Sequence, residues 1–314
     1  MSSPPLILIG GPTACRKTEL SVHLARHLGG EVICGDSVQL LAGFEIGSAS
    51  PTASERGDVP HHLFGSWSPL TPPDAGAWVR EADRIIAEVR ERGHRPIVVG
   101  GTGLYLKALR DGLAEIPAIP AEVRERLAQE HSAAGIEPLW RRLRAVDPEA
   151  ARNIQGGPRN TQRVLRALEV FEGTGKRLSV YHAEAMTEGG REAGAPRHET
   201  TLLVPDFAQP ILVQRLWRRV AAMLDAGFEA EVAGLLAQGV PPKGRALGTL
   251  GYRELSDWLM AHPGQPAPLG VREAIAAGHR AYAKRQRTWF RAMGGHSLDA
   301  SSSSFLDDAL SRVS

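Results

Sequence analysis

Residues 11–18 carry most of the pattern of a phosphate-binding loop. They read Gly-Pro-Thr-Ala-Cys-Arg-Lys-Thr, against the pattern G-x-x-x-x-G-K-[ST]. In such a loop, consecutive backbone N–H groups and the N-terminus of the following helix surround one anionic group. Lys17 would add a positive charge beside the terminal phosphate, and the hydroxyl of Thr18 would reach a Mg²⁺ ion. We therefore expect Thr18 to be a metal ligand, and a diphosphate or triphosphate to bind at Gly11, Pro12, Thr13, Ala14, Cys15, Arg16, Lys17 and Thr18. An ordinary corner between a strand and a helix is the alternative.

Arg16 is the one position of this loop that departs from the pattern, which has glycine there. A guanidinium group could hold a phosphate through two hydrogen bonds. A side chain at a position of close approach could instead block the pocket or strain the turn. The sequence leaves both alternatives open, and we favour crowding.

Two further loops with polar side chains follow short apolar runs. Asp36 comes after residues 31–34, and Thr102 comes after residues 96–99. Because ligands of parallel sheets bind at the carboxyl ends of the strands, we expect both loops to meet the phosphate loop in one crevice. A carboxylate there can hold Mg²⁺ or accept a proton from a nucleophile, although Asp36 could also cap a turn. The hydroxyl of Thr102 could contact phosphate or substrate, although its glycine-rich corner could be only a tight turn.

Apolar runs alternate with helical patterns at both ends of the chain, which predicts an α/β fold with a parallel sheet and crossover helices. The predicted strands are residues 6–9, 31–34, 96–99 and 201–204, and the flanking helices are 19–28, 76–92, 210–226, 229–238 and 271–293. Between them, residues 121–129, 137–145, 149–154 and 161–172 all have helical spacing. We therefore predict a phosphate-loop core of residues 1–116 and 197–296, a helical insertion of residues 117–196 and a flexible tail of residues 297–314.

The composition is that of an ordinary soluble globular protein, with 42% hydrophobic and 23% charged residues. No run of 18 apolar residues occurs, so we expect no membrane span and no export. The two cysteines, Cys15 and Cys34, argue against disulfides and zinc and fit a reducing cytoplasm. A net charge of +2 does not indicate nucleic-acid binding. Arginines do cluster in the insertion, but such clusters usually lie on solvated helix faces.

Eight sequence blocks, taken together, resemble one protein family. They are residues 11–18, 36–39, 60–63, 99–105, 162–170, 174–176, 250–255 and 282–290. The blocks Q-R-x-x-R-A-L-E and Y-A-K-R-Q-x-T-W-F are far more specific than a phosphate loop. In order and spacing, the chain from about residue 5 to residue 293 resembles the tRNA dimethylallyltransferases, also known as the IPP transferase family.

This resemblance implies transfer of a dimethylallyl group from dimethylallyl diphosphate to N6 of the adenosine 3′ of the anticodon, on a P-loop NTPase-like fold with Mg²⁺. It implies that Asp36 accepts the N6 proton and that Thr102 lies beside the adenosine. Arg215 and Arg219 would contact the diphosphate. The tRNA anticodon stem-loop would be bound by Asp36, Ser37, Val38, Gln39, Thr102, Arg124, Gln162, Arg163 and Arg166. The implied catalytic residues are Asp36, Thr102 and Arg215, and we expect a monomer.

The chain departs from the family pattern at several positions. Cys15-Arg16 stands in place of Ser-Gly, Leu41-Ala42 in place of Tyr-Arg, and Ser50 in place of lysine. Gly278-His279-Arg280 stands in place of Thr-Arg. Two other interpretations stay open, the first because of the phosphate loop and the second because of these departures. One is a phosphate-loop kinase or NTPase that acts on a small molecule, and the other is a family member that binds tRNA with impaired catalysis.

Overall fold

The computed structural model describes residues 4–185 and 197–314. The chain divides into two compact units, which are Met1–Arg110 with Arg197–Ser314, and Asp111–Pro196. We call the first the core unit and the second the insertion. The insertion begins at Asp111, ahead of residue 117, because the chain leaves the core where helix α4 (Gly103–Asp111) ends. The predicted end of the insertion, residues 186–196, lies outside the described residues.

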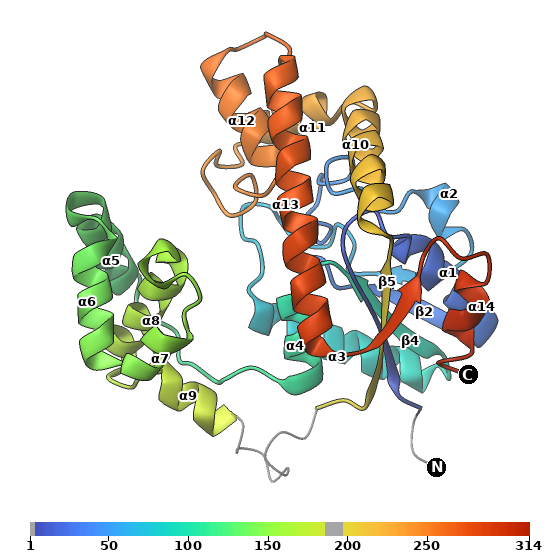
Figure 1. Ribbon diagram of the computed structural model, residues 1–314, viewed down its shortest axis with the longest axis horizontal. Helices are drawn as coiled ribbons and strands as arrows, with labels where there is room; N and C mark the ends of the chain where they lie inside the picture. The colour runs from blue at the N-terminus through green and yellow to red at the C-terminus, as the bar shows by residue number, and fades with distance from the viewer. Residues whose placement is uncertain (1–3, 186–196) are drawn as a thin grey trace. The chain divides into compact units, whose positions relative to one another are not determined.

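Within the described residues, six strands form one sheet in the order β3-β2-β4-β1-β5-β6, and every neighbouring pair is parallel (Figure 1). The strands are β1 (Leu6–Gly10), β2 (Gly30–Cys34), β3 (His61–His62), β4 (Arg95–Gly100), β5 (Thr200–Asp206) and β6 (His296–Asp299). The four inner strands are the four that the apolar runs predicted. The edge strands β3 and β6 were missed because they are short and polar.

The helices of the core unit cover the sheet or extend from one end of it. They are α1 (Lys17–Leu28), α2 (Ala53–Arg56), α3 (Ala75–Glu91), α4, α10 (Gln209–Asp225), α11 (Phe228–Ala237), α12 (Tyr252–Ala261), α13 (Leu269–Met293) and α14 (Phe305–Leu310). The insertion is helical, as predicted. Its elements are α5 (Ala121–Ala134), α6 (Ile136–Val146), α7 (Pro148–Asn153), the 3₁₀ turn η1 (Gly157–Arg159), α8 (Thr161–Thr174) and α9 (Leu178–Ala185).

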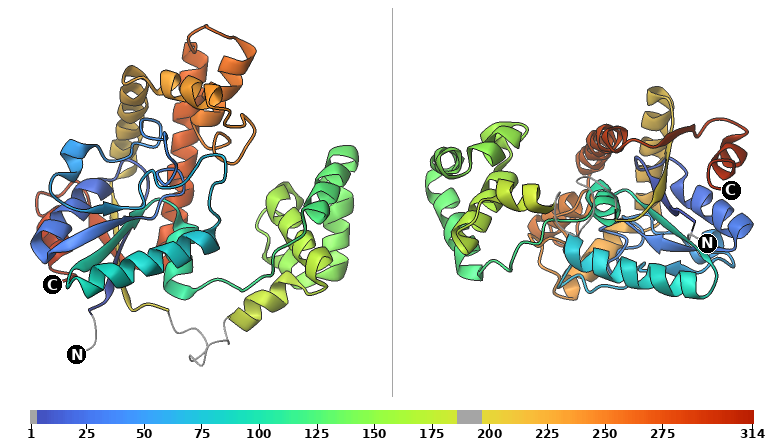
Figure 2. Two further views of the ribbon diagram at one scale, coloured as in Figure 1. Left: turned by 180° about the vertical axis from the view of Figure 1, so that it is seen from behind. Right: turned by 90° about the horizontal axis from the view of Figure 1, so that it is seen from below.

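Alternate residues of β1 pack on opposite faces of the sheet, because successive side chains of a strand point to opposite sides. Ile7 and Ile9 belong to the cluster that contains buried residues of α1 and α10. Leu8 belongs to the cluster that contains buried residues of α3 and α4 and Phe290 of α13. Figures 1 and 2 show the sheet between these helices. Both faces are therefore covered, which explains the continuous apolar run in β1.

The prediction of a flexible tail from residue 297 is wrong. Strand β6 pairs with β5, and α14 packs against α1. The run of four serines suggested disorder, yet it forms hydrogen-bonded turns in which Ser301 bonds to Asp299. Beyond it, Phe305, Ala309 and Val313 recur at helical spacing and are at most 5% exposed. The burial of this apolar stripe orders the C-terminal segment.

The insertion has a hydrophobic core of its own, made by residues of α5, α6, α7 and α8. Asp147 is fully buried there and accepts hydrogen bonds from the backbone N–H groups of Ala150 and Ser179. These bonds tie the start of α7 to the start of α9. Among the described residues, no helix is both long enough and apolar enough to cross a membrane.

Candidate active site

The phosphate loop runs from the end of β1 to the start of α1. Gly11 has no room for a side chain, because a Cβ atom there would lie 2.9 Å from the carbonyl oxygen of Pro205. Ala14 and Arg16 both have left-handed backbones, with φ values of 66° and 60°. Among the described residues, the backbone N–H groups of residues 14–18 have no acceptor. They are the groups that can surround an anion at the N-terminus of α1.

Lys17 folds back onto the loop that precedes it. Its Nζ donates to the carbonyl oxygens of Pro12, at 2.7 Å, and Gly11, at 3.1 Å. Burial, together with the positive charge of Arg219, lowers the pKa of Lys17 to about 8. The ammonium group therefore loses its proton more readily than an exposed lysine, and a bound phosphate would favour the charged form.

Asp36 both shapes its own turn and faces the phosphate loop. Its Oδ1 accepts a hydrogen bond from the N–H of Val38 at 3.0 Å, and its Oδ2 accepts one from the N–H of Gly101 at 3.2 Å. The hydroxyl of Thr102 accepts from the N–H of Ser37 and donates to its Oγ. Asp36 can therefore cap its turn and also act on a ligand, since each carboxylate oxygen retains a further lone pair.

A cavity of about 620 Å³ in the core unit joins most of the predicted residues. Its wall contains the loop residues Thr13, Ala14, Cys15, Arg16, Lys17 and Thr18, the turn residues Asp36, Ser37, Val38 and Gln39, and Arg215 and Arg219. Gly11 and Pro12 do not line it, and their carbonyl oxygens accept hydrogen bonds from Lys17. Thr102 does not line it either, because its hydroxyl is directed at Ser37. Asp36 and the phosphate loop therefore share one cavity, as the topology predicted.

The two arginines of α10 have different surroundings. Nε of Arg215 donates to the carbonyl oxygen of Ala14 at 2.9 Å, and its guanidinium lies 4.5 Å from the ring centre of Phe207. Arg219 donates to the carbonyl oxygen of Ser48 at 3.3 Å, while its Nε has no partner among the described residues. Burial lowers the pKa of Arg219. Arg215 is thus anchored to the phosphate loop, and Arg219 retains a donor for a ligand.

Gln286 is a site residue to which we gave no role from the sequence. Its Oε1 accepts from the N–H of Thr13 at 3.0 Å, and its Nε2 donates to the carbonyl oxygen of Gly101 at 2.9 Å. It thereby joins the phosphate loop to the loop that holds Asp36. The only signal in the sequence was its position in the Y-A-K-R-Q block.

Glu231 of α11 is a second residue that we missed. Its carboxylate accepts hydrogen bonds from the backbone N–H groups of Glu45, Ile46 and Gly47 and from the hydroxyl of Tyr252. These bonds fix the loop that follows Gln39, whose side chain donates to Ser48 and Ala49. No spacing in the sequence indicates that α11 supports this loop.

The predicted RNA-binding residues of the insertion lie on α5 and α8. Gln162 and Arg163 are exposed in the first turn of α8, and Arg166 lies one turn further along. Glu169 pairs with Arg166 at 3.5 Å and with Arg124 at 4.0 Å. Arg163 has no ion-pair partner in the part of the chain that the structure describes. It is therefore the most available of these cations for an external phosphate.

Thr18 can be a magnesium ligand if a phosphate substrate supplies further ligands to the ion. It lines the cavity, and its hydroxyl has no hydrogen-bond partner among the described residues. Within residues 4–185 and 197–314, no three acidic, histidine or cysteine side chains gather to hold a metal. Mg²⁺ commonly binds through few protein oxygens, with phosphate oxygens and water completing its coordination. The donor set is thus compatible with a magnesium–diphosphate complex and not with a metal cage made by protein alone.

Comparison with known proteins identifies the family of this chain. The family model described as IPP transferase matches residues 39–293. The chain belongs to the IPP transferase family. A second model, described as isopentenyl transferase, matches residues 4–59. The resemblance seen in the sequence blocks is confirmed.

Relatives and solved structures agree with this assignment. The tRNA dimethylallyltransferase 1 of Pelobacter propionicus is 40% identical over 92% of this chain and 90% of its own length. A tRNA isopentenylpyrophosphate transferase from Bacillus halodurans is 32% identical with a TM-score of 0.68, covering 98% of this chain and 94% of that one. A eukaryotic dimethylallyltransferase described as acting on tRNA has a TM-score of 0.76 at 26% identity, over 98% and 77% of the two chains. The predicted α/β fold is therefore confirmed.

Proposed function

We propose that this chain transfers a dimethylallyl group from dimethylallyl diphosphate to N6 of the adenosine 3′ of the anticodon in tRNA, releasing diphosphate. One observation carries the proposal. The anion-binding loop at the start of α1 and the carboxylate of Asp36 line the same cavity, next to Arg219. In one cavity, the loop can therefore stabilise the negative charge of a leaving group while Asp36 takes a proton from a nucleophile.

The reaction forms one bond and breaks one. The N6 nitrogen attacks the allylic carbon C1, and the bond between C1 and the diphosphate oxygen breaks, with its electron pair leaving on the diphosphate. Asp36 accepts the proton from N6. Its hydrogen bonds from Val38 and Gly101 orient the carboxylate, which a general base needs.

Charge on the leaving diphosphate is stabilised by the free N–H groups of residues 14–18, by Lys17 and by Arg219. Arg215 acts mainly by holding the carbonyl of Ala14, and so the shape of the loop. When bound, Mg²⁺ would neutralise the diphosphate beside Thr18. Thr102 acts through Ser37 and keeps the turn of Asp36 in place.

We propose that the insertion binds the RNA through the first turns of α8. Gln162 and Arg163 are exposed there, and Arg166 shares their face of the helix at a spacing of three. Arginines on such a face bind RNA phosphates by releasing counterions. The target base must leave its stack to reach a carboxylate in a cavity, and a loop nucleotide does so more easily than a paired one. The expectations of a monomer and of the cytoplasm stay predictions.

The test is incubation of the protein with dimethylallyl diphosphate, Mg²⁺ and an anticodon stem-loop RNA, followed by mass spectrometry of the RNA. We expect a gain of one dimethylallyl group on the adenosine 3′ of the anticodon. An RNA in which that adenosine is replaced by guanosine is the matched control. Binding of RNA without transfer would support the impaired family member. Hydrolysis of ATP in the absence of RNA would support a kinase or NTPase.

A further inference from the structure

Arg16 has an unfavourable backbone conformation in the phosphate loop. It is the residue before helix α1, and its φ and ψ of 60° and 25° lie in the left-handed region. Glycine adopts this conformation without strain, whereas the Cβ atom of any other L-residue opposes it. A non-glycine residue stays there only when its surroundings hold it.

All three nitrogen atoms of the Arg16 guanidinium donate a hydrogen bond, and in each case the acceptor is a protein group. Nε and one terminal nitrogen donate to the two carboxylate oxygens of Glu19 at 2.7 and 2.6 Å. The other terminal nitrogen donates to the carbonyl oxygen of Ala300 at 2.7 Å. The group also lies 4.7 Å from the ring centre of Phe305, in cation–π geometry.

Two of these partners belong to the C-terminal segment that the sequence led us to expect as flexible. Ala300 follows β6 and bonds back to β5, since its N–H donates to the carbonyl oxygen of Asp206. Phe305 begins α14, is 1% exposed and packs in the same hydrophobic cluster as Leu20 of α1. The segment is therefore anchored on the sheet and on α1 without the help of Arg16.

We propose that Arg16 is a positioning residue, and that residues 300–314 form a C-terminal latch which holds the phosphate loop in its anion-binding shape through Arg16. This proposal rests on the proposed function, in which the loop binds the diphosphate. Arg16 is thus neither a side-chain ligand of phosphate nor an obstruction of the pocket, the two alternatives that the sequence left open.

The latch has a consequence that distinguishes it from ordinary packing. With arginine at position 16, the loop needs the latch, because the contacts with Ala300 and Phe305 help to hold the left-handed backbone that an arginine opposes. With glycine at position 16, the backbone is unstrained and the latch has nothing to hold. The effect of damaging the latch on diphosphate binding therefore depends on the residue at position 16.

The experiment is a cycle of four full-length proteins, namely the parent, Arg16→Gly, Phe305→Leu and the double variant. Inorganic pyrophosphate with Mg²⁺ is the probe for calorimetric binding, and steady-state KM is measured for dimethylallyl diphosphate and for RNA. In the parent background, Phe305→Leu should raise Kd for pyrophosphate and KM for dimethylallyl diphosphate about three- to tenfold. The KM for RNA and kcat should change little. In the Arg16→Gly background, the same substitution should have no effect within about twofold.

A fifth variant, Arg16→Lys, separates the effect of the guanidinium contacts from the effect of the positive charge. Lysine keeps the charge and the strain, but it cannot bind Glu19 and Ala300 at once as the guanidinium fork does. We expect Arg16→Lys to bind pyrophosphate less tightly than Arg16→Gly. Thermal unfolding followed by circular dichroism shows that each variant is folded at the assay temperature.

Three outcomes would overturn the latch. A loss of affinity of about tenfold or more in Arg16→Gly would make Arg16 a phosphate ligand. Equal effects of Phe305→Leu in both backgrounds would make the contact ordinary packing. A gain of more than about tenfold in Arg16→Gly would mean that the arginine obstructs the site. Lys17→Ala is the control for the proposed function. If the parent binds pyrophosphate no better than Lys17→Ala, the loop is not the diphosphate site and the proposed function is contradicted.

Discussion

The side chain of Gln286 accepts a hydrogen bond from the backbone N–H of Thr13 across 273 positions of sequence. The same amide group donates to the carbonyl oxygen of Gly101, in the loop whose N–H binds Asp36. One residue of α13 thus fixes the distance between the proposed leaving-group site and the proposed base. Alignment of this kind matters because a small misplacement of reacting groups costs a large factor in rate.

Replacing Gln286 should therefore affect both ends of the reaction. In Gln286→Ala, the N–H of Thr13 and the carbonyl of Gly101 lose their partner. We expect kcat/KM for dimethylallyl diphosphate to fall by about tenfold or more. Steady-state kinetics checks this, with Gln214→Ala, on the exposed side of α10, as the matched control. If both variants match the parent, the bridge is not needed for catalysis.

Asp36→Asn tests the general base directly. The amide keeps the size of the side chain and one acceptor oxygen, but it cannot take a proton from N6. The single-turnover rate should fall by at least about 10²-fold, while affinity for the RNA changes little. A rate within about threefold of the parent would remove Asp36 from the proton transfer.

Lys17 predicts how diphosphate binding depends on pH. Its pKa is lowered to about 8, mainly by burial, so the charged form is present below that value and is lost as pH rises through it. A bound diphosphate favours the charged form, so affinity should fall by up to about tenfold per pH unit above about pH 8. Calorimetry with inorganic pyrophosphate between about pH 7 and pH 9 measures this slope. The difference from Lys17→Ala isolates the lysine from the titration of pyrophosphate itself.

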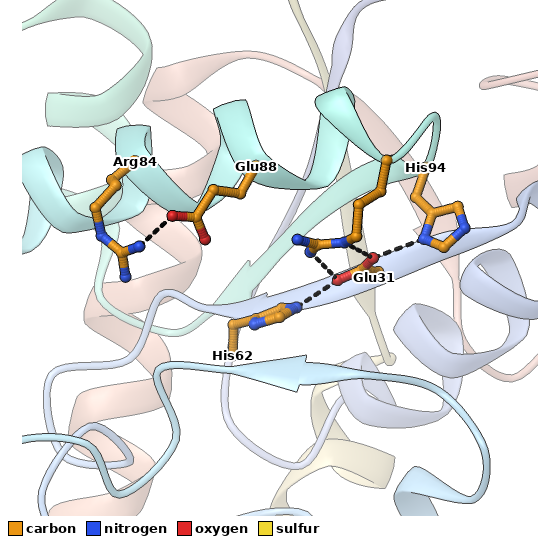
Figure 3. Close-up of polar contacts among 6 residues, drawn as sticks. Glu31, His62, Arg84, Glu88 and His94 are labelled. Atoms are coloured by element: carbon orange, nitrogen blue, oxygen red, sulfur yellow. Dashed lines mark hydrogen bonds and ion pairs between the residues drawn. The ribbon is translucent and has the colours of Figure 1, made fainter.

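The carboxylate of Glu31 in β2 lies away from the cavity and has a strongly lowered pKa. Figure 3 shows it between His62 and His94, which bind it at 2.5 and 2.6 Å. Arg92 contacts both of its oxygens, at 2.7 and 3.0 Å. The hydrogen bonds from Arg92, with those from the histidines, lower the pKa of Glu31 to about 2.

The lowered pKa of Glu31 means that its ionised form stabilises the folded protein. Because the pKa of folded Glu31 is below its ordinary value, its contribution is present above about pH 4 and is lost as pH falls toward 2. A shift of this size corresponds to about 3 kcal/mol of unfolding free energy. Urea unfolding should show Glu31→Gln destabilised by about 2–3 kcal/mol at neutral pH, with a smaller difference from the parent at about pH 3.

The matched control for this measurement is Glu88→Gln. Glu88 pairs with Arg84 on the surface of α3, as Figure 3 shows. An exposed pair contributes at most about 1 kcal/mol, so this variant should unfold nearly as the parent does. Equal destabilisation of the two variants would contradict the special stabilisation of Glu31.

Substitution of Arg163 and Arg166 tests whether the insertion binds RNA. Replacing both with alanine should weaken binding of an anticodon stem-loop and reduce its salt dependence by about one to two phosphate equivalents. Pyrophosphate binding should not change, since the loop around Lys17 belongs to the core unit. Arg141→Ala with Arg144→Ala, two exposed arginines of α6, is the control for net charge. Unchanged RNA affinity in the Arg163 and Arg166 variant would show that this face of α8 does not bind the RNA.

The sequence by itself determined the elements that carry strong local patterns. Residues 6–9 and 96–99 are apolar runs that only a strand buried on both faces explains, and they became β1 and β4. The phosphate loop and Asp36 follow such strands, so the topology of a parallel sheet was enough to predict that Asp36 and loop residues 13–18 line one cavity. The specific blocks gave the family, which the comparisons confirm.

Only the tertiary structure decided how these residues are held. The partner of the Thr13 N–H is Gln286, and the distant partners of Arg16 are Ala300 and Phe305. The loop after Gln39 is held by Glu231. Each contact joins segments far apart in the chain, and no local pattern encodes such a pairing. The C-terminal segment shows the same limit. Its serines favour disorder locally, but the free energy of burying Phe305 and Ala309 against α1 exists only once the sheet and α1 are folded.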